Sequence, residues 1–215
     1  MNTLYGANQR ALQDRFDTRR LADKIEQVAV AQDINDMNKA FIESRDMFWL
    51  SSVDQNGSPT VSYKGGDPGF VKVIDAKTIA FPLYDGNGMF YSAGNVAGSG
   101  KVGLLFMDFE RPNRLRVQGT ARISETDPLM KHFHEAVLVV RVSVDAIFPN
   151  CPRYVHRMQK VKPSKYVPRT QCQTPIAGWK NIDMLQGDLP ARDQASLKKA
   201  GAKPISIEEW FGKVI

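Results

Sequence analysis

Cationic and small polar side chains alternate with apolar ones in the stretch NRLRVQG, near the middle of the chain. Arg114, Arg116 and Gln118 fall on one face of an extended strand, because successive side chains of a strand point to opposite faces. Leu115 and Val117 fall on the other face, toward a core. Such a row of donors can bind an anionic ligand. The alternative is the solvated outer face of an antiparallel strand, which shows the same alternation.

Two glycine-containing loops precede this strand, SYKGGDPGF and DGNGMFYSAGNV. Glycine tolerates positive φ, so backbone N–H groups in the first loop, which Lys64 and Lys72 flank, can converge on an anion. The second loop predicts the start of a short helix, with Asp85 or Asn87 as N-cap and free N–H groups open to a phosphate. Neither loop is a Walker or Rossmann motif, and ordinary turns are the alternative for both.

A third group of polar residues follows the last predicted strand, in NCPRYVHR. Arg153, Tyr154 and His156 bring acid–base and anion-binding groups together there, either as a substrate site or as a basic surface turn. His132 and His134 are spaced i, i+2 and point to different sides of a helix, so we predict no metal site. The sequence shows no Ser-His-Asp or Cys-His arrangement, and the catalytic residues stay unknown.

Short apolar runs separated by Gly, Pro, Asn and Asp clusters predict that most of the core is a β-sheet. The run MFWLSSV begins it, the turn Asp54–Gly57 joins the first two strands, and AVLVVRVSVDAIFP ends it. Most aromatic residues are expected in the core rather than against a ligand.

Upstream, residues 8–30 carry apolar side chains at helical spacing and predict one helix that packs on the core through Leu12, Phe16, Leu21, Ile25 and Val28. Asp33 or Asn35 can cap a second helix that ends at Ser44.

The composition limits the function classes. The 215 residues, with 42% hydrophobic residues and a formal net charge of +6, suit one domain with extensions. Lys and Arg are spread along the chain, which argues against nucleic-acid binding. Cys151 and Cys172 are too isolated for a disulfide framework or a zinc site. No apolar run reaches the length of a membrane span. We expect a cytoplasmic protein with no membrane partner.

The order of these motifs, GFVKVID, TIAFP, NGMFYSAGNV, KVGLLFMDF and LRVQGTARI, resembles the pyridoxamine 5′-phosphate oxidase-like family of FMN binders over roughly residues 41–149. The N-terminal ALQDRFDTRRLADKIE resembles a bacterial subgroup of that family with no assigned substrate. The resemblance implies a mainly β fold, a six-stranded antiparallel split barrel with flanking helices. It also implies a homodimer with FMN at the interface. We expect N-terminal packing helices in 1–45, the FMN-binding barrel in 46–157, and an extended arm with a short helix in 158–215.

Carried over residue by residue, the family pattern implies these cofactor-binding positions: Lys64, Gly69, Phe70, Val71, Lys72, Phe81, Pro82, Asn87, Gly88, Met89, Arg114, Arg116 and Gln118. The sequence departs from the pattern at the helix start, where Asn87-Gly88 replaces an arginine–lysine pair. The FMN phosphate must then be met by Lys64, Lys72, Arg114 or Arg116.

The resulting hypothesis is an FMN-dependent oxidoreductase acting on an unidentified small molecule. A cation such as Arg114 or Arg116 near the pyrimidine edge of the flavin would favour its anionic reduced form. The alternative is a flavin- or haem-binding protein without catalytic turnover. Nucleic-acid binding ranks last, because no basic stripe with interleaved aromatic residues is visible.

Overall fold

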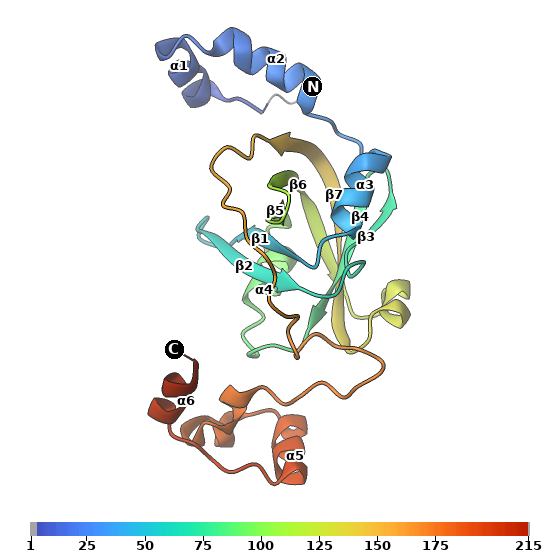
Figure 1. The fold of residues 1–215 in the computed structure, drawn as a ribbon, viewed down its shortest axis with the longest axis vertical. Coiled ribbons are helices and arrows are strands. Elements are labelled where there is room, and N and C mark those ends of the chain that lie inside the picture. Colours follow the sequence, from blue (N-terminus) through green and yellow to red (C-terminus); the bar gives the residue numbers. More distant parts are fainter. Residues whose placement is uncertain (1–3, 215) are drawn as a thin grey trace. The chain divides into compact units, whose positions relative to one another are not determined.

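The computed structural model describes residues 4–214. The chain divides into two compact units, residues 1–161 and residues 162–215 (Figure 1). The first unit holds the β-sheet and the N-terminal helices, and the second is formed by short helices and loops.

The first unit is organised around one antiparallel sheet in the order β2-β1-β5-β6-β7-β4-β3. Its strands are β1 (Met47–Val53), β2 (Pro59–Gly65), β3 (Lys72–Asp75), β4 (Thr78–Tyr84), β5 (Lys101–Asp108), β6 (Asn113–Ser124) and β7 (Ala136–Asn150). The predicted count of six strands is wrong: the described residues form seven, because the four-residue β3 makes a strand of its own at the edge.

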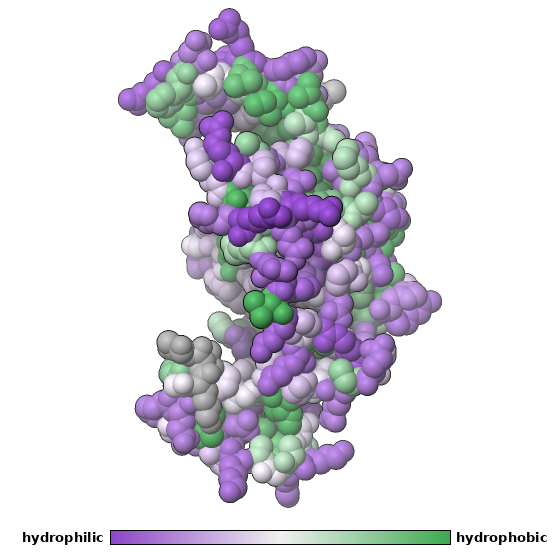
Figure 2. Space-filling model, in the orientation of Figure 1, coloured by the Kyte–Doolittle hydropathy of each residue, from purple (hydrophilic) through white to green (hydrophobic). Residues whose placement is uncertain are grey.

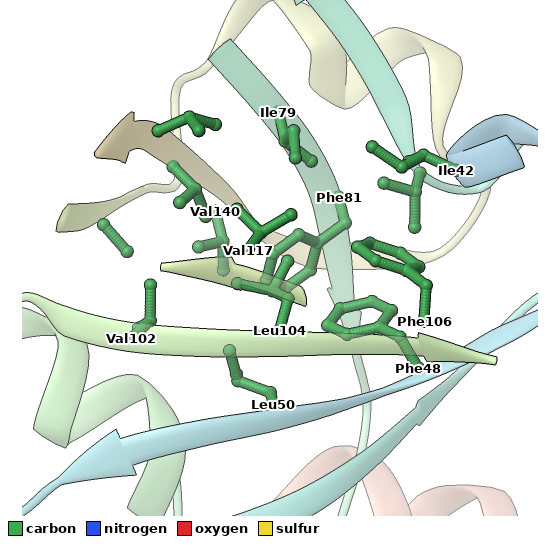
Figure 3. Close-up of a cluster of buried hydrophobic side chains, with 14 of the residues drawn as sticks. Ile42, Phe48, Leu50, Ile79, Phe81, Val102, Leu104, Phe106, Val117 and Val140 are labelled. Atoms are coloured by element: carbon green, nitrogen blue, oxygen red, sulfur yellow. The ribbon is translucent and has the colours of Figure 1, made fainter. Parts of the chain in front are cut away.

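The sheet curls without closing. β1 and β4 lie four strands apart in the sheet order, yet the rings of Phe48 and Phe81 meet with centroids 4.9 Å apart. The edge strands β2 and β3 are not paired with each other, so the predicted barrel is split open along this line. Figure 3 shows the buried side chains gathered inside the curl, with Phe48, Phe81 and Phe106 facing one another.

The turn between β1 and β2 forms as predicted. The Asp54 carboxylate accepts hydrogen bonds from the backbone N–H groups of Asn56 (2.8 Å) and Ser58 (2.9 Å). Gly57 adopts a φ of +81°, which a residue with a Cβ rarely does. The turn therefore sets the register that pairs Val53 with Pro59 and Met47 with Gly65.

The N-terminal region differs from the prediction of one packing helix. Two helices, α1 (Ala7–Arg15) and α2 (Arg19–Ala29), are separated by Asp17 at a φ of +53°. The apolar side chains expected to pack are exposed instead, because α1 and α2 meet through charged residues. The next helix, α3 (Asp36–Glu43), is capped by Asn35, whose side chain accepts from the Asn38 N–H at 2.8 Å, as predicted.

The second unit has more helix than the extended arm that we predicted. It contains the 3₁₀ helices η2 (Gly178–Asn181) and η3 (Asp183–Asp188), then α5 (Ala191–Ala200) and α6 (Ile207–Val214). Only the last was predicted. Its small core includes Ile182, Leu189 and Leu197, and a buried Lys180 pairs with Asp193 at 2.9 Å. No helix within residues 4–214 is both long and apolar enough to cross a membrane.

Candidate functional site

A groove of about 640 Å³ lies on the outer face of the sheet, the face turned away from the core. Four neighbouring strands supply its floor, and the segment after β7 supplies one wall. The residues that line it are Trp49, Ser51, Val61, Gly103, Leu104, Leu105, Met107, Phe109, Arg114, Arg116, Val117, Gln118, Tyr154, Val155, His156 and Met158.

The floor of the groove is apolar because β5 carries apolar residues in both phases. Leu104 and Phe106 are buried in the core, while Leu105 and Met107 turn toward the groove. Trp49 stands opposite Leu105 on β1 and makes an edge-to-face contact with Phe109, with ring centroids 6.0 Å apart. Such a surface suits the flat, apolar face of an aromatic ligand.

Polar groups come from β6 at one side of the groove. Arg114 donates through Nη2 to the backbone oxygen of Cys151 at 2.7 Å, but its Nε is buried and has no hydrogen-bond partner. A buried donor without an acceptor costs about 1–3 kcal/mol. Arg116 and Gln118 follow on the same face and are exposed. The groove therefore offers one desolvated donor and two solvated polar side chains.

Residues 151–160, which we call the strap, run along the groove after β7. The Met158 N–H donates to the Phe109 oxygen, and Arg157 Nε donates to the Glu110 oxygen, both at 3.0 Å. Lys160 Nζ pairs with Asp46 Oδ2 at 2.5 Å, which raises the pKa of Lys160. These contacts hold Tyr154 and His156 at the rim of the groove.

The structure brings together five of the predicted site residues. Arg114, Arg116 and Gln118 line the groove from β6, and Tyr154 and His156 line it from the strap. Arg153 is exposed in the strap beside Tyr154 and is not part of the lining.

Other predicted positions lie outside the groove lining. Lys64 is half-buried in the inward phase of β2, opposite Phe48, and burial lowers its pKa. Phe70 and Val71 are buried in the core cluster, as is Phe81. Pro82 is buried on β4, Lys72 begins β3, and Gly69 lies in the loop before it.

The loop before α4 (Tyr91–Gly98) is exposed and corrects the predicted N-cap. Asn87 Oδ1 accepts from the Met89 N–H at 3.1 Å, a local turn that ends before the helix. The N-cap is Phe90, in the left-handed region at φ 48°, rather than Asp85 or Asn87. Asn87, Gly88 and Met89 therefore lie in an open loop and not on the first helical turn.

The apolar lining was missed by the sequence-based prediction. Trp49, Leu105, Met107, Phe109 and Met158 carry no charge and match no motif. Apolar residues in both phases of KVGLLFM were the available signal, because a strand with one solvated face alternates. Within residues 4–214, no group of three or more His, Cys, Asp or Glu side chains is placed to hold a metal ion.

Three solved structures align with about half of the chain. Group A Streptococcus HupZ is 21% identical, with 59% of this chain and 99% of that chain covered and a TM-score of 0.45. A candidate pyridoxamine 5′-phosphate oxidase from Lactobacillus delbrueckii is 21% identical, with coverages of 55% and 95% and a TM-score of 0.44. HutZ, the heme storage protein from Vibrio cholerae, is 17% identical, with coverages of 54% and 93% and a TM-score of 0.40.

These TM-scores are below 0.5, so the family assignment rests on the sequence. No curated protein matches the chain. The family model described as pyridoxamine 5′-phosphate oxidase matches residues 34–160, which is more than half of the chain and spans the sheet, the groove and the strap. The chain therefore belongs to the pyridoxamine 5′-phosphate oxidase family.

Proposed function

We propose that the chain is an FMN-dependent oxidoreductase that acts on a small molecule, with FMN bound in the groove on the outer face of the sheet. The observation that carries this proposal is the buried Nε of Arg114, which lines the groove and has no acceptor. A ligand that presents a carbonyl oxygen or a ring nitrogen to it would remove that cost.

The groove fits a flavin in chemistry. The isoalloxazine ring has apolar faces, for which Trp49 and Leu105 provide cover, and a pyrimidine edge rich in acceptors, which Arg114 and Gln118 can meet. Bound FMN would supply hydride or electron transfer, and the protein would supply placement and electrostatics. A cation at the pyrimidine edge favours the anionic reduced ring.

Arg116 is our candidate for the FMN phosphate. Its side chain is exposed in the groove and makes no hydrogen bond or ion pair with the residues that the structure describes. Lys64 and Lys72 remain alternative phosphate ligands, although neither lines the groove. The other positions implied by the family pattern, including Gly69 and Asn87, also remain predictions.

A second copy of the chain would close the groove from the open side. Val61, which lines the groove, and Tyr63, which lies outside the lining, are both exposed on β2, and Tyr63 extends the surface beyond the groove. The substrate would enter beside the strap, where His156 and Tyr154 offer groups that can hold or move a proton. Arg153, beside Tyr154 in the strap, would attract an anionic substrate.

The proposal is tested by FMN titration of the purified protein, followed by flavin fluorescence and absorption. We expect saturable binding and a higher melting temperature with FMN. Arg114→Gln should weaken binding about tenfold, the cost of losing one charge-assisted hydrogen bond. Arg122→Gln is the matched control, since Arg122 lies on the same strand outside the groove lining, and its affinity should match the wild type. A colourless protein that does not respond to FMN contradicts the proposal.

Turnover is tested separately. FMN-loaded protein should be reduced by a nicotinamide or deazaflavin donor and reoxidised by an acceptor over repeated cycles. Binding without such cycling would favour the second candidate, a flavin- or haem-binding protein without turnover.

The haem form of that alternative is favoured by His156, the one histidine of the described residues that lines the groove, where an imidazole can ligate iron. Haem titration with wild type and His156→Ala decides it, because a Soret shift that disappears in the variant would indicate ligation by this residue.

A further inference from the structure

Helices α1 and α2 form a hairpin, and they face each other through charged side chains. Arg10 pairs with Asp23 at 2.5 Å and with Glu26 at 3.8 Å, and Arg19 pairs with Asp14. Paired helices usually join through apolar residues and leave their charges in water. Here the polar sides meet, which leaves the apolar sides without a partner.

The apolar residues lie on the opposite side of each helix, at helical spacing. Leu12 and Phe16 are spaced i, i+4 at α1, and Leu21, Ile25 and Val28 are spaced i, i+4, i+7 on α2. Their exposed fractions are 56% and 68% for the first pair, and 61%, 47% and 67% for the second set. On the face in view, Figure 2 shows hydrophobic surface over the hairpin between hydrophilic side chains. Grouped exposure of this kind marks an interaction surface, whereas single exposed apolar residues are common.

We propose that the α1–α2 hairpin is a docking arm whose apolar sides pack against a second copy of this chain. This inference extends the homodimer proposed above, and the identity of the partner rests on that proposal. It adds a contact surface separate from the groove and places the N-terminal helices in the assembly.

The exposed area agrees with such a partner. Because the polar sides of α1 and α2 meet, the two apolar stripes face away from each other, and the partner must contact the hairpin from both sides. The five side chains then offer roughly 500 Å² per chain, so two copies that bury them would remove roughly 1,000 Å² from water, just below the usual size of a specific interface. Val61, at the groove, and Tyr63 on the same strand are also more than half exposed, and a partner that covers them together with the hairpin would bring the total to roughly 1,500 Å². That value is standard for a stable dimer.

The charge of the hairpin argues against a membrane as the occupant. Residues 7–29 contain five basic side chains (Arg10, Arg15, Arg19, Arg20, Lys24) and four acidic ones (Asp14, Asp17, Asp23, Glu26), a net charge of +1. Helices that lie on anionic membranes carry a predominantly basic polar face. A nearly neutral apolar surface is instead compatible with itself, as a two-fold symmetric interface requires.

The test is the dimer dissociation constant, measured by sedimentation velocity over a concentration series. The double variant Leu21→Asp/Ile25→Asp should raise that constant at least about tenfold, because it places two carboxylates in a desolvated contact. Gln27→Asp adds one carboxylate to the same helix outside the apolar stripe and should leave the constant within about twofold. Far-UV circular dichroism of all three proteins should agree, since every substituted side chain is largely exposed.

The outcomes separate this inference from FMN binding. A double variant that dimerises as tightly as the wild type overturns the docking arm, whether or not FMN binds. A wild-type chain that is monomeric yet binds FMN overturns the docking arm and the homodimer, and leaves the FMN site standing. A hairpin-dependent dimer that binds no FMN supports the docking arm and overturns only the FMN proposal. If the chain dimerised only in the presence of anionic vesicles, the surface would be assigned to a membrane and the inference would be overturned.

Discussion

The two faces of β1, β5 and β6 differ in composition and burial. The inner face carries Phe48, Phe106 and Leu115, which are buried and have no polar atom to satisfy. The outer face carries Trp49 and Arg114, and one of its donors is buried without a partner. Neighbouring residues on the same strand are thus constrained by different interactions. Packing constrains the residues of the inner face, whereas hydrogen bonding constrains those of the outer face.

The largest expected effect is a loss of stability that differs between substitutions on the inner face and on the outer face. Phe106→Ala should lower the free energy of unfolding by about 3–5 kcal/mol, because it leaves a cavity among Phe48 and its neighbours. Trp49→Ala removes a larger side chain from an open groove and should cost about 1 kcal/mol. Urea denaturation measures both. Equal losses would mean that the outer face also holds the fold together.

The second prediction compares a paired outer-face arginine with Arg114. Arg141 donates to both oxygens of Asp127, through Nε at 2.6 Å and Nη2 at 3.0 Å, and this bonding lowers the pKa of the buried carboxylate below 3.8. Asp127→Asn should cost about 1–3 kcal/mol at neutral pH, whereas Arg114→Gln should cost less, because Arg114 Nε has no bond to lose and only the single bond from Nη2 to the Cys151 oxygen is removed.

The pH dependence of Asp127 follows from the direction of that shift. A carboxylate whose pKa is lower in the folded state stabilises the protein above its unfolded pKa of 3.8, and the gain is lost as pH falls from there through the folded pKa. The stability difference between wild type and Asp127→Asn should therefore be constant near neutrality and shrink below pH 3.8. A difference that grows in acid would contradict the assigned pair.

Two glycines, Gly119 and Gly103, allow a matched comparison of the space that each face leaves for an added Cβ. A Cβ at Gly119 would lie 2.3 Å from the backbone oxygen of Ser143, and one at Gly103 would lie 3.7 Å from the Ser51 Cβ. Gly119→Ala should cost about 1–3 kcal/mol, and Gly103→Ala about 0.5 kcal/mol or less. Gly103→Leu would project into the groove and should block FMN while the protein stays folded.

The smallest effect concerns the strap. Lys160→Ala removes a partly exposed ion pair with Asp46 and should cost less than about 1 kcal/mol. It should nevertheless speed proteolysis between residues 151 and 160, because one attachment of the strap is gone. Lys162→Ala, at an exposed neighbouring lysine, is the control. Unchanged cleavage would mean that the backbone bonds of Met158 and Arg157 hold the strap alone.

The strands could be predicted because each apolar run is bounded by turn residues, and the hairpin at Gly57 because Asn-Gly accepts its backbone angles. The polar side of the groove was found from the alternation of Arg114, Arg116 and Gln118. The apolar floor was not, since Leu105 and Met107 look like any core residue.

The exposed apolar stripe of α2 was predicted to be core for the same reason. Periodicity shows that a face is apolar, and only tertiary contacts show what covers it. The helix α5 has weak periodicity, and nothing in the local sequence indicates that Lys180 is buried and pairs with Asp193.

The split in the sheet leaves two strand edges that could recruit further chains, and the molecule treats them unequally. At β3 the side chain of Glu43 accepts the Val73 N–H at 3.0 Å, so α3 occupies the place where an added strand would bind. At β2 Pro59 lacks an N–H and Lys64 is a desolvated cation, which together leave little regular edge for an intruding strand. An added strand would therefore be blocked at β3 and could pair only with the part of β2 between Pro59 and Lys64.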